Sequence, residues 1–199
     1  MDGVSLYAKR ALDIMLALGA SIILSPILVS IALLVKLTSR GPVLYKQERV
    51  SLDGTRFAIY KFRTMFTNAE EHGPGWSKPG DDRVTPLGRV LRSLSLDELP
   101  QLFNVVRGEM SIVGPRPERP VFIEEFKQRV PRYMLRHKVP AGMTGWAQVN
   151  GWRGETGEIE KMEMRVRYDL YYVNNWSLWF DLRIIFMTFF MVVVGKNAH

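Results

Sequence analysis

An uncharged apolar run near the start of the chain most constrains its fold. Residues 14–35 are 22 consecutive positions without Asp, Glu, Lys or Arg. As a helix, the run would measure about 33 Å, against roughly 30 Å for the hydrocarbon core of a bilayer. It exceeds the apolar part of a typical signal peptide, and no small-residue cleavage site follows it. We therefore expect a membrane segment.

Ser25 and Pro26 lie in the middle of this run and argue against a straight span. Proline lacks the backbone N–H and kinks a helix, while the serine hydroxyl can bond the freed carbonyls. Basic residues flank the run, with Lys9 before it and Lys36 after it, and the positive-inside rule places both on the cytoplasmic side. We predict a re-entrant helix-break-helix over residues 1–38. A proline-kinked spanning helix is the main alternative, and a buried core helix, which needs a larger protein around it, is the third.

The composition excludes several kinds of chemistry. The 199 residues contain no cysteine, which rules out disulfides, thiolate metal sites, iron–sulfur clusters and a cysteine nucleophile. The three histidines are far apart in sequence, so a histidine metal site of the usual spacing is not expected. A hydrophobic content of 47% and a charged content of 24% are typical of a folded domain rather than a disordered chain.

The formal charge of +7 is unevenly distributed. Residues 36–63 carry seven basic and two acidic side chains (+5), residues 127–152 carry five and none (+5), and residues 64–126 carry seven and ten (−3). Basic residues near a membrane segment attract anionic headgroups by about 1 kcal/mol each. Because no helix-turn-helix, zinc finger or RNA-binding motif accompanies the charge, we predict membrane lipids as a partner and no nucleic acid.

The rest of the chain predicts a mainly helical α+β fold. Strands over 43–50 and 55–63, joined across an Asp-Gly turn, predict a β-hairpin that packs with helices. Gly- and Pro-rich segments predict loops. Amphipathic spacing predicts helices, and in the helix 158–173 we expect the charged side chains to face outward. The predicted loops are 67–82, 109–120 and 139–154, and the predicted helices are 87–106 with an interruption at Pro100, 121–136 and 158–173.

The C-terminal segment 176–194 is rich in aromatic residues. Its uninterrupted apolar part, 184–194, has only 11 residues and is too short to cross a bilayer. Aromatic rings favour the headgroup region, so we predict an interfacial helix. A core helix of the globular part is the alternative.

Asp97 and Glu98 are the first candidates for chemistry, because two adjacent carboxylates stand just before Pro100. Successive helical residues diverge by about 100°, so the pair could address two neighbouring atoms. A structural reading is also open, since Ser95 and Glu98 have capping-box spacing and Asp97 could itself be an N-cap.

Arg116 is the second candidate, because Pro115 and Pro117 fix the backbone on both sides of it. Its guanidinium matches phosphate oxygens bidentately, although a rigid surface turn explains the same pattern. Further candidate cations are Lys61, Arg63 and Arg153.

A family resemblance covers these features in order along nearly the whole chain. The motifs are Lys9-Arg10-x-x-Asp13, Ser25-Pro26, GPVLYKQERV (41–50), YKFRTM (60–65), DDRVTPLGRVLRSLSLDELPQLFNV (81–105), MSIVGPRPE (110–118) and PAGMTGWAQVNGWRG (140–154). The sequence strongly resembles the small monotopic phosphoglycosyl transferases, bacterial sugar transferases that start glycan assembly on polyprenol phosphate. One departure is the turn at 51–54, where family members often carry an earlier glycine.

The resemblance implies transfer of a hexose 1-phosphate from a UDP-sugar to undecaprenyl phosphate, with release of UMP, as the first membrane step of exopolysaccharide, capsule or O-antigen synthesis. It implies that Asp97 is the nucleophile, that Glu98 holds Mg²⁺, and that Pro115, Arg116 and Pro117 help to bind the nucleotide or its phosphates. It also implies that the Ser-Pro pair breaks a re-entrant helix. Residues 150–182 resemble members that handle glucose or galactose 1-phosphate.

Physical chemistry is consistent with these roles. A carboxylate that attacks a diphosphate meets like-charge repulsion of about 4 kcal/mol per unit pair at an effective dielectric near 20. Fixed cations offset that repulsion, and Mg²⁺ needs only one or two carboxylates besides the substrate. Two other functions stay open: a non-catalytic membrane-surface scaffold and a Mg²⁺-dependent UDP-sugar hydrolase.

The expected organisation is one integrated unit. Residues 1–38 form the membrane segment, and residues 39–199 form a cytoplasmic catalytic domain with C-terminal interfacial helices. We expect a monotopic protein on the cytoplasmic face of the bacterial inner membrane. The sequence permits a homo-oligomer and a further N-terminal domain, which many relatives carry.

Overall fold

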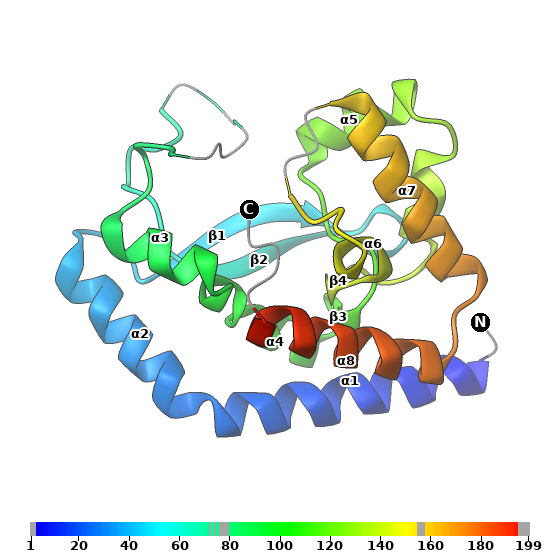
Figure 1. Ribbon diagram of the computed structural model, residues 1–199, viewed down its shortest axis with the longest axis horizontal. Helices are drawn as coiled ribbons and strands as arrows, with labels where there is room; N and C mark the ends of the chain where they lie inside the picture. Colours follow the sequence, from blue (N-terminus) through cyan, green and yellow to red (C-terminus); the bar gives the residue numbers. More distant parts are fainter. Residues whose placement is uncertain (1–2, 72, 74, 76–79, 155–157, 195–199) are drawn as a thin grey trace.

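A computed structural model describes residues 3–71, 73, 75, 80–154 and 158–194. The chain begins with two long helices, α1 (Gly3–Ile23) and α2 (Ser25–Thr38), which run along one side of the molecule in Figure 1. The segments Ser5–Ile23 and Ser25–Thr38 meet at an angle of 63°. The predicted helix break at Ser25-Pro26 is therefore confirmed.

The break has the local chemistry that the sequence predicts. Proline at position 26 has no N–H to donate to the carbonyl of Ile22, four residues earlier. The hydroxyl of Ser25 donates to that carbonyl at 2.8 Å instead. Serine and proline together thus bend the helix without leaving this acceptor unpaired.

The two helices expose much of their apolar surface. Ile22 and Ile23 at the end of α1 are 73% and 76% exposed, and Leu37 on α2 is 81% exposed. A buried core helix is therefore the wrong reading of this segment. No single helix in the described part of the chain is long and apolar enough to cross a membrane, although the bent pair passes the same test together.

The predicted hairpin is confirmed. β1 (Leu44–Val50) and β2 (Arg56–Phe62) pair antiparallel, from Leu44 opposite Phe62 to Val50 opposite Arg56. The connecting turn η1 (Leu52–Gly54) places Asp53 at φ 50° and Gly54 at φ 82°. Asp tolerates this left-handed conformation better than most residues do, so the turn forms without an earlier glycine.

The predicted helix 87–106 is divided earlier than Pro100. The structure forms α3 (Pro86–Ser93), the 3₁₀ turn η2 (Leu96–Glu98) and α4 (Gln101–Arg107). The chain leaves the helical conformation at Ser95, which has φ 58°, whereas Pro100 stands at the start of α4. Asn104 on α4 then donates to the carbonyl of Ala58 and accepts from the N–H of Tyr60, which covers the free edge of β2.

Two short strands lie where the sequence predicts loops. β3 (Ser111–Val113) and β4 (Gly142–Thr144) pair in parallel. The backbones cross so closely that a Cβ atom at Gly142 would collide with the backbone nitrogen of Gly114. The glycines that favour a loop in sequence are therefore required for close packing.

Helices cover the remaining side of the molecule (Figure 1). The predicted helix 121–136 ends early, because Val130 precedes Pro131 and adopts an extended conformation. Helix α7 agrees closely with its prediction. The elements are α5 (Pro120–Arg129), η3 (Tyr133–Lys138), α6 (Trp146–Val149) and α7 (Ile159–Asn174).

The last helix, α8 (Leu178–Val194), runs beside α1 in Figure 1. Asp181 on α8 forms a buried ion pair with Lys9 on α1 at 2.7 Å. Ile184 is fully buried, whereas Trp179 and Phe186 are 78% and 71% exposed. One side of α8 thus packs on the protein, and the other presents exposed aromatic rings.

Candidate active site

Asp97 and Glu98 lie in the single turn η2, between α3 and α4. The capping-box reading of this motif is wrong, because the side chain of Ser95 makes no capping hydrogen bond. Asp97 does not cap α4 either, since Pro100 occupies the position before that helix. Neither carboxylate therefore caps a helix, and both line a cavity of about 570 Å³.

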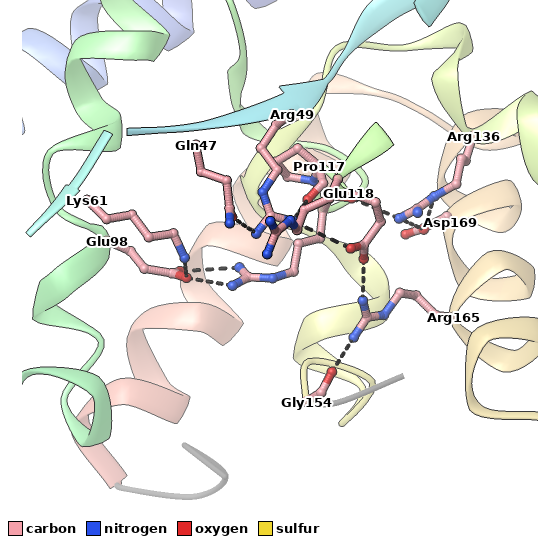
Figure 2. A network of polar contacts seen from close by, with 12 residues as sticks. Gln47, Arg49, Lys61, Glu98, Pro117, Glu118, Arg136, Gly154, Arg165 and Asp169 are labelled. Atoms are coloured by element: carbon pink, nitrogen blue, oxygen red, sulfur yellow. Dashed lines mark hydrogen bonds and ion pairs between the residues drawn. The ribbon is translucent and has the colours of Figure 1, made fainter. Parts of the chain in front are cut away.

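Three cations surround the carboxylate of Glu98. Lys61 from β2 lies 2.7 Å from Oε1, Arg116 lies 2.5 Å from the same oxygen, and Arg153 lies 3.4 Å from Oε2. Figure 2 shows Lys61 and Glu98 pointing toward each other. Burial alone would raise the pKa of Glu98, but the charges of Arg116 and Lys61 outweigh it and hold that pKa well below its ordinary value. Glu98 is thus an anion held in a cationic cage.

The carboxylate of Asp97 differs sharply from that of its neighbour. It forms no hydrogen bond or ion pair with any side chain or backbone group in the described ranges. Burial raises its pKa, against the opposing charge of Lys61. An unpaired, desolvated carboxylate at a cavity wall is available to react with a ligand.

The structure brings most of the predicted site residues together. Lys61, Arg116 and Arg153 converge on Glu98 although they come from distant parts of the sequence. Pro115 and Pro117 hold the Arg116 backbone through their carbonyls, which accept from Gly142 N and Arg49 Nη1 respectively.

Arg63 lines the same cavity but makes different contacts. Its Nε and Nη2 donate to the carbonyls of Pro42 and Ser39 at 2.6 and 2.9 Å. These bonds join the end of β2 to the segment that follows α2. Arg63 therefore fixes the connection between α2 and the hairpin, whereas Lys61 contacts Glu98 in the site.

A second charged group was not predicted from the sequence. Glu118 forms a 2.6 Å ion pair with Arg165 of α7 and lies 3.6 Å from Arg49 of β1, as Figure 2 shows. Arg165 also donates to the carbonyls of Trp152 and Gly154 at 3.0 and 2.6 Å. Arg165 thus holds the backbone on both sides of Arg153, the residue that contacts Glu98.

A further buried pair supports Arg116. Arg136 and Asp169 form an ion pair at 2.7 Å, and Arg136 donates to the carbonyl of Arg116 at 2.9 Å. The prediction that the charges of 158–173 face outward is wrong for Arg165 and Asp169, which are 2% and 1% exposed. Their spacing of four residues, in register with buried Met162, is the signal that would have revealed a charged stripe on the inner face.

The donor atoms of the site fit a hard divalent cation. No group of three or more His, Asp or Glu side chains with metal-binding geometry exists among residues whose placement is described. Magnesium, however, needs only one or two carboxylates and takes its other ligands from water and substrate phosphates. Oε2 of Glu98 is the oxygen that fits this role, because among the described residues it has only the long contacts to Arg116 and Arg153 at 3.3 and 3.4 Å.

A carboxylate pair in a cation-lined cavity suits a phosphate-bearing ligand, because fixed cations stabilise its negative charge. The family model described as "Bacterial sugar transferase" matches residues 4–195. The chain belongs to this family.

The chain is similar to several characterised proteins. It is 49% identical over 199 residues to the UDP-glucose:undecaprenyl-phosphate glucose-1-phosphate transferase of Escherichia coli (strain K12). The aligned region covers 100% of this chain and 43% of that protein. It is 43% identical over 193 residues to a UDP-N-acetylgalactosamine-undecaprenyl-phosphate N-acetylgalactosaminephosphotransferase of Aeromonas hydrophila, covering 97% and 45%. It is 43% identical over 189 residues to an exopolysaccharide production protein of Rhizobium leguminosarum bv. phaseoli, covering 93% and 94%. The chain thus spans less than half of the first two relatives.

Proposed function

We propose that this protein transfers a hexose 1-phosphate from a UDP-sugar to undecaprenyl phosphate and releases UMP. The observation that carries the proposal is the contrast within the carboxylate pair: Asp97 is unpaired in the described structure, while Glu98 is neutralised by Lys61, Arg116 and Arg153. Family membership and the names of the relatives support the substrate class. Four relatives named for UDP-glucose favour glucose as the sugar, with galactose as the second candidate.

The reaction is a double displacement at phosphorus. An oxygen of Asp97 attacks the phosphorus that bears the sugar, an O–P bond forms, and the bond to the bridging oxygen breaks, so that UMP leaves with the electron pair. The phosphate oxygen of the lipid then attacks the same phosphorus, the bond to Asp97 breaks, and the carboxylate is restored. Covalent catalysis allows UMP to leave before the lipid binds, so one small site serves two unlike substrates.

The cations of the site support the first displacement. Lys61, Arg116 and Arg153 offset the charge of the diphosphate and stabilise the departing UMP. Glu98 would hold Mg²⁺ together with the substrate phosphates, and the ion would supply Lewis-acid stabilisation of the phosphoryl oxygens. Arg136 and Arg165 keep Arg116 and Arg153 in place through backbone carbonyls.

The assay that tests this function measures UMP. Purified protein should release UMP from UDP-glucose in the presence of Mg²⁺ and undecaprenyl phosphate, with one glycolipid formed per UMP. Sustained UMP release without lipid would support a UDP-sugar hydrolase instead. Binding to lipid vesicles with no UMP release from any UDP-sugar would support a membrane-surface scaffold.

We also propose that α1 and α2 form a re-entrant segment on the cytoplasmic face of the bacterial inner membrane, in contact with its lipids. The 63° bend and the exposed apolar side chains of both helices support this topology. Because the chain has no native cysteine, single-cysteine variants report topology directly. We expect Ser5→Cys and Arg40→Cys to be labelled by a membrane-impermeant maleimide from the same, cytoplasmic side. Labelling from opposite sides would establish a kinked spanning helix.

The acidic limb of the pH–rate profile should depend on Lys61. Asp97 must be ionised to attack, so activity falls as the pH drops through its pKa. Burial raises that pKa, and the charge of Lys61 opposes the rise. Lys61→Met should therefore move the acidic limb of kcat/KM to higher pH. Lys46→Met is the matched control, because Lys46 is exposed on the neighbouring strand and should leave the limb in place. An unmoved limb in Lys61→Met would contradict the assignment.

Arg165 should act as a positioning residue. Lys in its place keeps the charge beside Glu118 but has one ammonium group, which cannot reproduce the fork that reaches the Trp152 and Gly154 carbonyls. We expect Arg165→Lys to lower kcat/KM for UDP-glucose by roughly tenfold, the effect of about 1.4 kcal/mol. The matched control is Arg167→Lys, at an exposed position of the same helix. Equal kcat/KM values for Arg165→Lys and Arg167→Lys would contradict a positioning role for Arg165.

A further inference from the structure

A second cavity, of about 380 Å³, adjoins the first. Glu98 and Arg153 line both cavities, so the two share one wall at the charged centre of the site. The remaining wall of the second cavity is mostly apolar. It comes from α1, α4, α6 and α8, from the strands β3 and β4, and from the segments next to η2 and between α1 and α2. Its apolar residues include Ala20, Leu24, Leu102, Ile185, Phe189 and Met191.

Three of the polar side chains on this wall, Thr144, Gln148 and Thr188, already have hydrogen-bond partners. Thr188 donates to the carbonyl of Ile184 at 2.8 Å, so the 2.7 Å contact between the hydroxyls of Thr144 and Thr188 takes its hydrogen from Thr144. The side-chain amide of Gln148 donates to the carbonyl of Met143. Away from Glu98 and Arg153, the cavity therefore suits a hydrocarbon, because these polar groups already have partners.

The mouth of this cavity continues an exposed apolar surface. Phe189 on α8 and Leu94 after α3 both line the cavity and are 69% and 52% exposed. Neighbouring exposed side chains extend this surface along α1 and α8, namely Ile22, Ile23, Phe186 and Phe190. A ligand could therefore lie with one end outside the protein among apolar side chains and the other end at Arg153.

We propose that this cavity binds the isoprenoid units next to the phosphate of the lipid acceptor, and that Arg153 guides that phosphate from the apolar cavity into the polar one. The inference rests on the proposed function. A molecule with a hydrocarbon body and one anionic end matches a cavity whose apolar wall leads to a single arginine. No other described arginine or lysine lines this cavity.

The arrangement also satisfies the geometry of a double displacement. Attack on phosphorus proceeds in line with the bond that breaks. The acceptor phosphate must therefore occupy the space that UMP vacates, opposite the bond to Asp97. Asp97 lines only the polar cavity, so the acceptor phosphate must pass the shared wall at Arg153 while its chain stays behind in the apolar cavity.

Two pairs of variants test the cavity. Ala20→Phe fills it, and Ala11→Phe places the same side chain at an exposed position of α1 outside it. Phe189→Ala removes a ring from its mouth, and Phe186→Ala removes an equally exposed ring of α8 that does not line it (69% against 71%). Each control matches its partner in chemistry and helix, and Phe186 also matches Phe189 in exposure, so loss of general membrane affinity appears in both members of that pair. Ala20 is partly buried whereas Ala11 is exposed, so the UMP burst of Ala20→Phe is the check that this variant still folds.

Two readouts separate this inference from the proposed function. The first is the burst of UMP from UDP-glucose without lipid, which reports the reaction of Asp97 alone. The second is the KM for undecaprenyl phosphate in detergent micelles. Rates are normalised to the burst. We expect Ala20→Phe and Phe189→Ala each to raise the KM for undecaprenyl phosphate at least about tenfold relative to the matched control. The reason is that burial of one aromatic side chain contributes about 1.5–3 kcal/mol.

Equal KM values within each pair would overturn the cavity assignment and leave the proposed function standing. Weaker binding of Phe189→Ala than Phe186→Ala to phosphatidylglycerol vesicles, with an unchanged KM, would also overturn it, because an ordinary acyl chain would then be the occupant. A wild-type protein that gives neither burst nor turnover would instead refute the proposed function.

Discussion

Asp97→Asn should abolish transfer, lowering UMP release from UDP-glucose on the order of 10³-fold or more. The amide has nearly the same shape as the carboxylate but is neutral and cannot form the O–P bond. Lys61, Arg116 and Arg153 stay paired with Glu98 in this variant, so donor binding should survive. The measurement is UMP release with lipid present, together with the affinity for UDP-glucose.

The same variant should be at least as stable as the wild type. Because burial raises the pKa of Asp97, the folded state disfavours its ionised form, and at pH 7 that cost opposes folding. A neutral amide removes the cost. Asp82→Asn, at an exposed position, is the matched control and should change neither activity nor stability. Normal turnover by Asp97→Asn would refute the assignment of the nucleophile.

Asp181→Ala should have the largest effect on stability. Its carboxylate accepts from Lys9 at 2.7 Å, from the Tyr172 hydroxyl at 2.7 Å and from Trp176 Nε1 at 3.2 Å, and it joins α8 to α1. Removal of one partner of a buried ion pair costs about 3–5 kcal/mol, since the other charge is left without full compensation. We expect a fall in the unfolding midpoint of roughly 6–20 °C for a chain of this size, measured in detergent by circular dichroism.

Two comparisons make this result specific. The double variant Lys9→Met with Asp181→Leu removes both charges of this pair and should recover part of the lost stability, because Asp13, 3.9 Å from Lys9, then loses its cation. Glu48→Ala breaks the exposed pair with Arg56 and should change stability by less than about 1 kcal/mol. If Asp181→Ala is no less stable than the Glu48→Ala variant, then the ion pair does not hold α8 against α1.

The local features of the fold were predictable because they rest on short-range chemistry. Ser25 and Pro26 predict the helix break, and the structure places the serine hydroxyl on the carbonyl that proline leaves free. The hairpin follows from two β-rich segments around the turn at Asp53 and Gly54. In each case the residues that determine the structure are neighbours in sequence.

The parallel pairing of β3 with β4 was not predictable, because each strand has only three residues and the partners lie 31 positions apart. Gly114 and Gly142 permit this close approach, yet in sequence they are typical of loops. The early break at Ser95 was missed for a similar reason. Pro100 is the obvious helix breaker, whereas the left-handed conformation of Ser95 depends on its tertiary surroundings.

The candidate site was predicted in part. The carboxylate pair and Arg116 stand out as local motifs, and two of the further candidate cations, Lys61 and Arg153, lie next to Glu98 in the structure. The sequence could not separate Arg63, whose guanidinium binds backbone carbonyls, from Lys61, two residues earlier. It also concealed Glu118 and Arg165, which meet only in the folded chain, 47 residues apart.

The covalent phosphosugar on Asp97 is the central claim, and intact-protein mass spectrometry tests it most directly. Protein incubated with UDP-glucose and Mg²⁺ without lipid, then quenched in acid, should carry one hexose phosphate, and peptide mapping should place it on Asp97. Undecaprenyl phosphate added before the quench should remove it, and Asp97→Asn should never acquire it. An unmodified wild-type protein that still makes glycolipid, or an adduct mapped to another residue, would contradict the account.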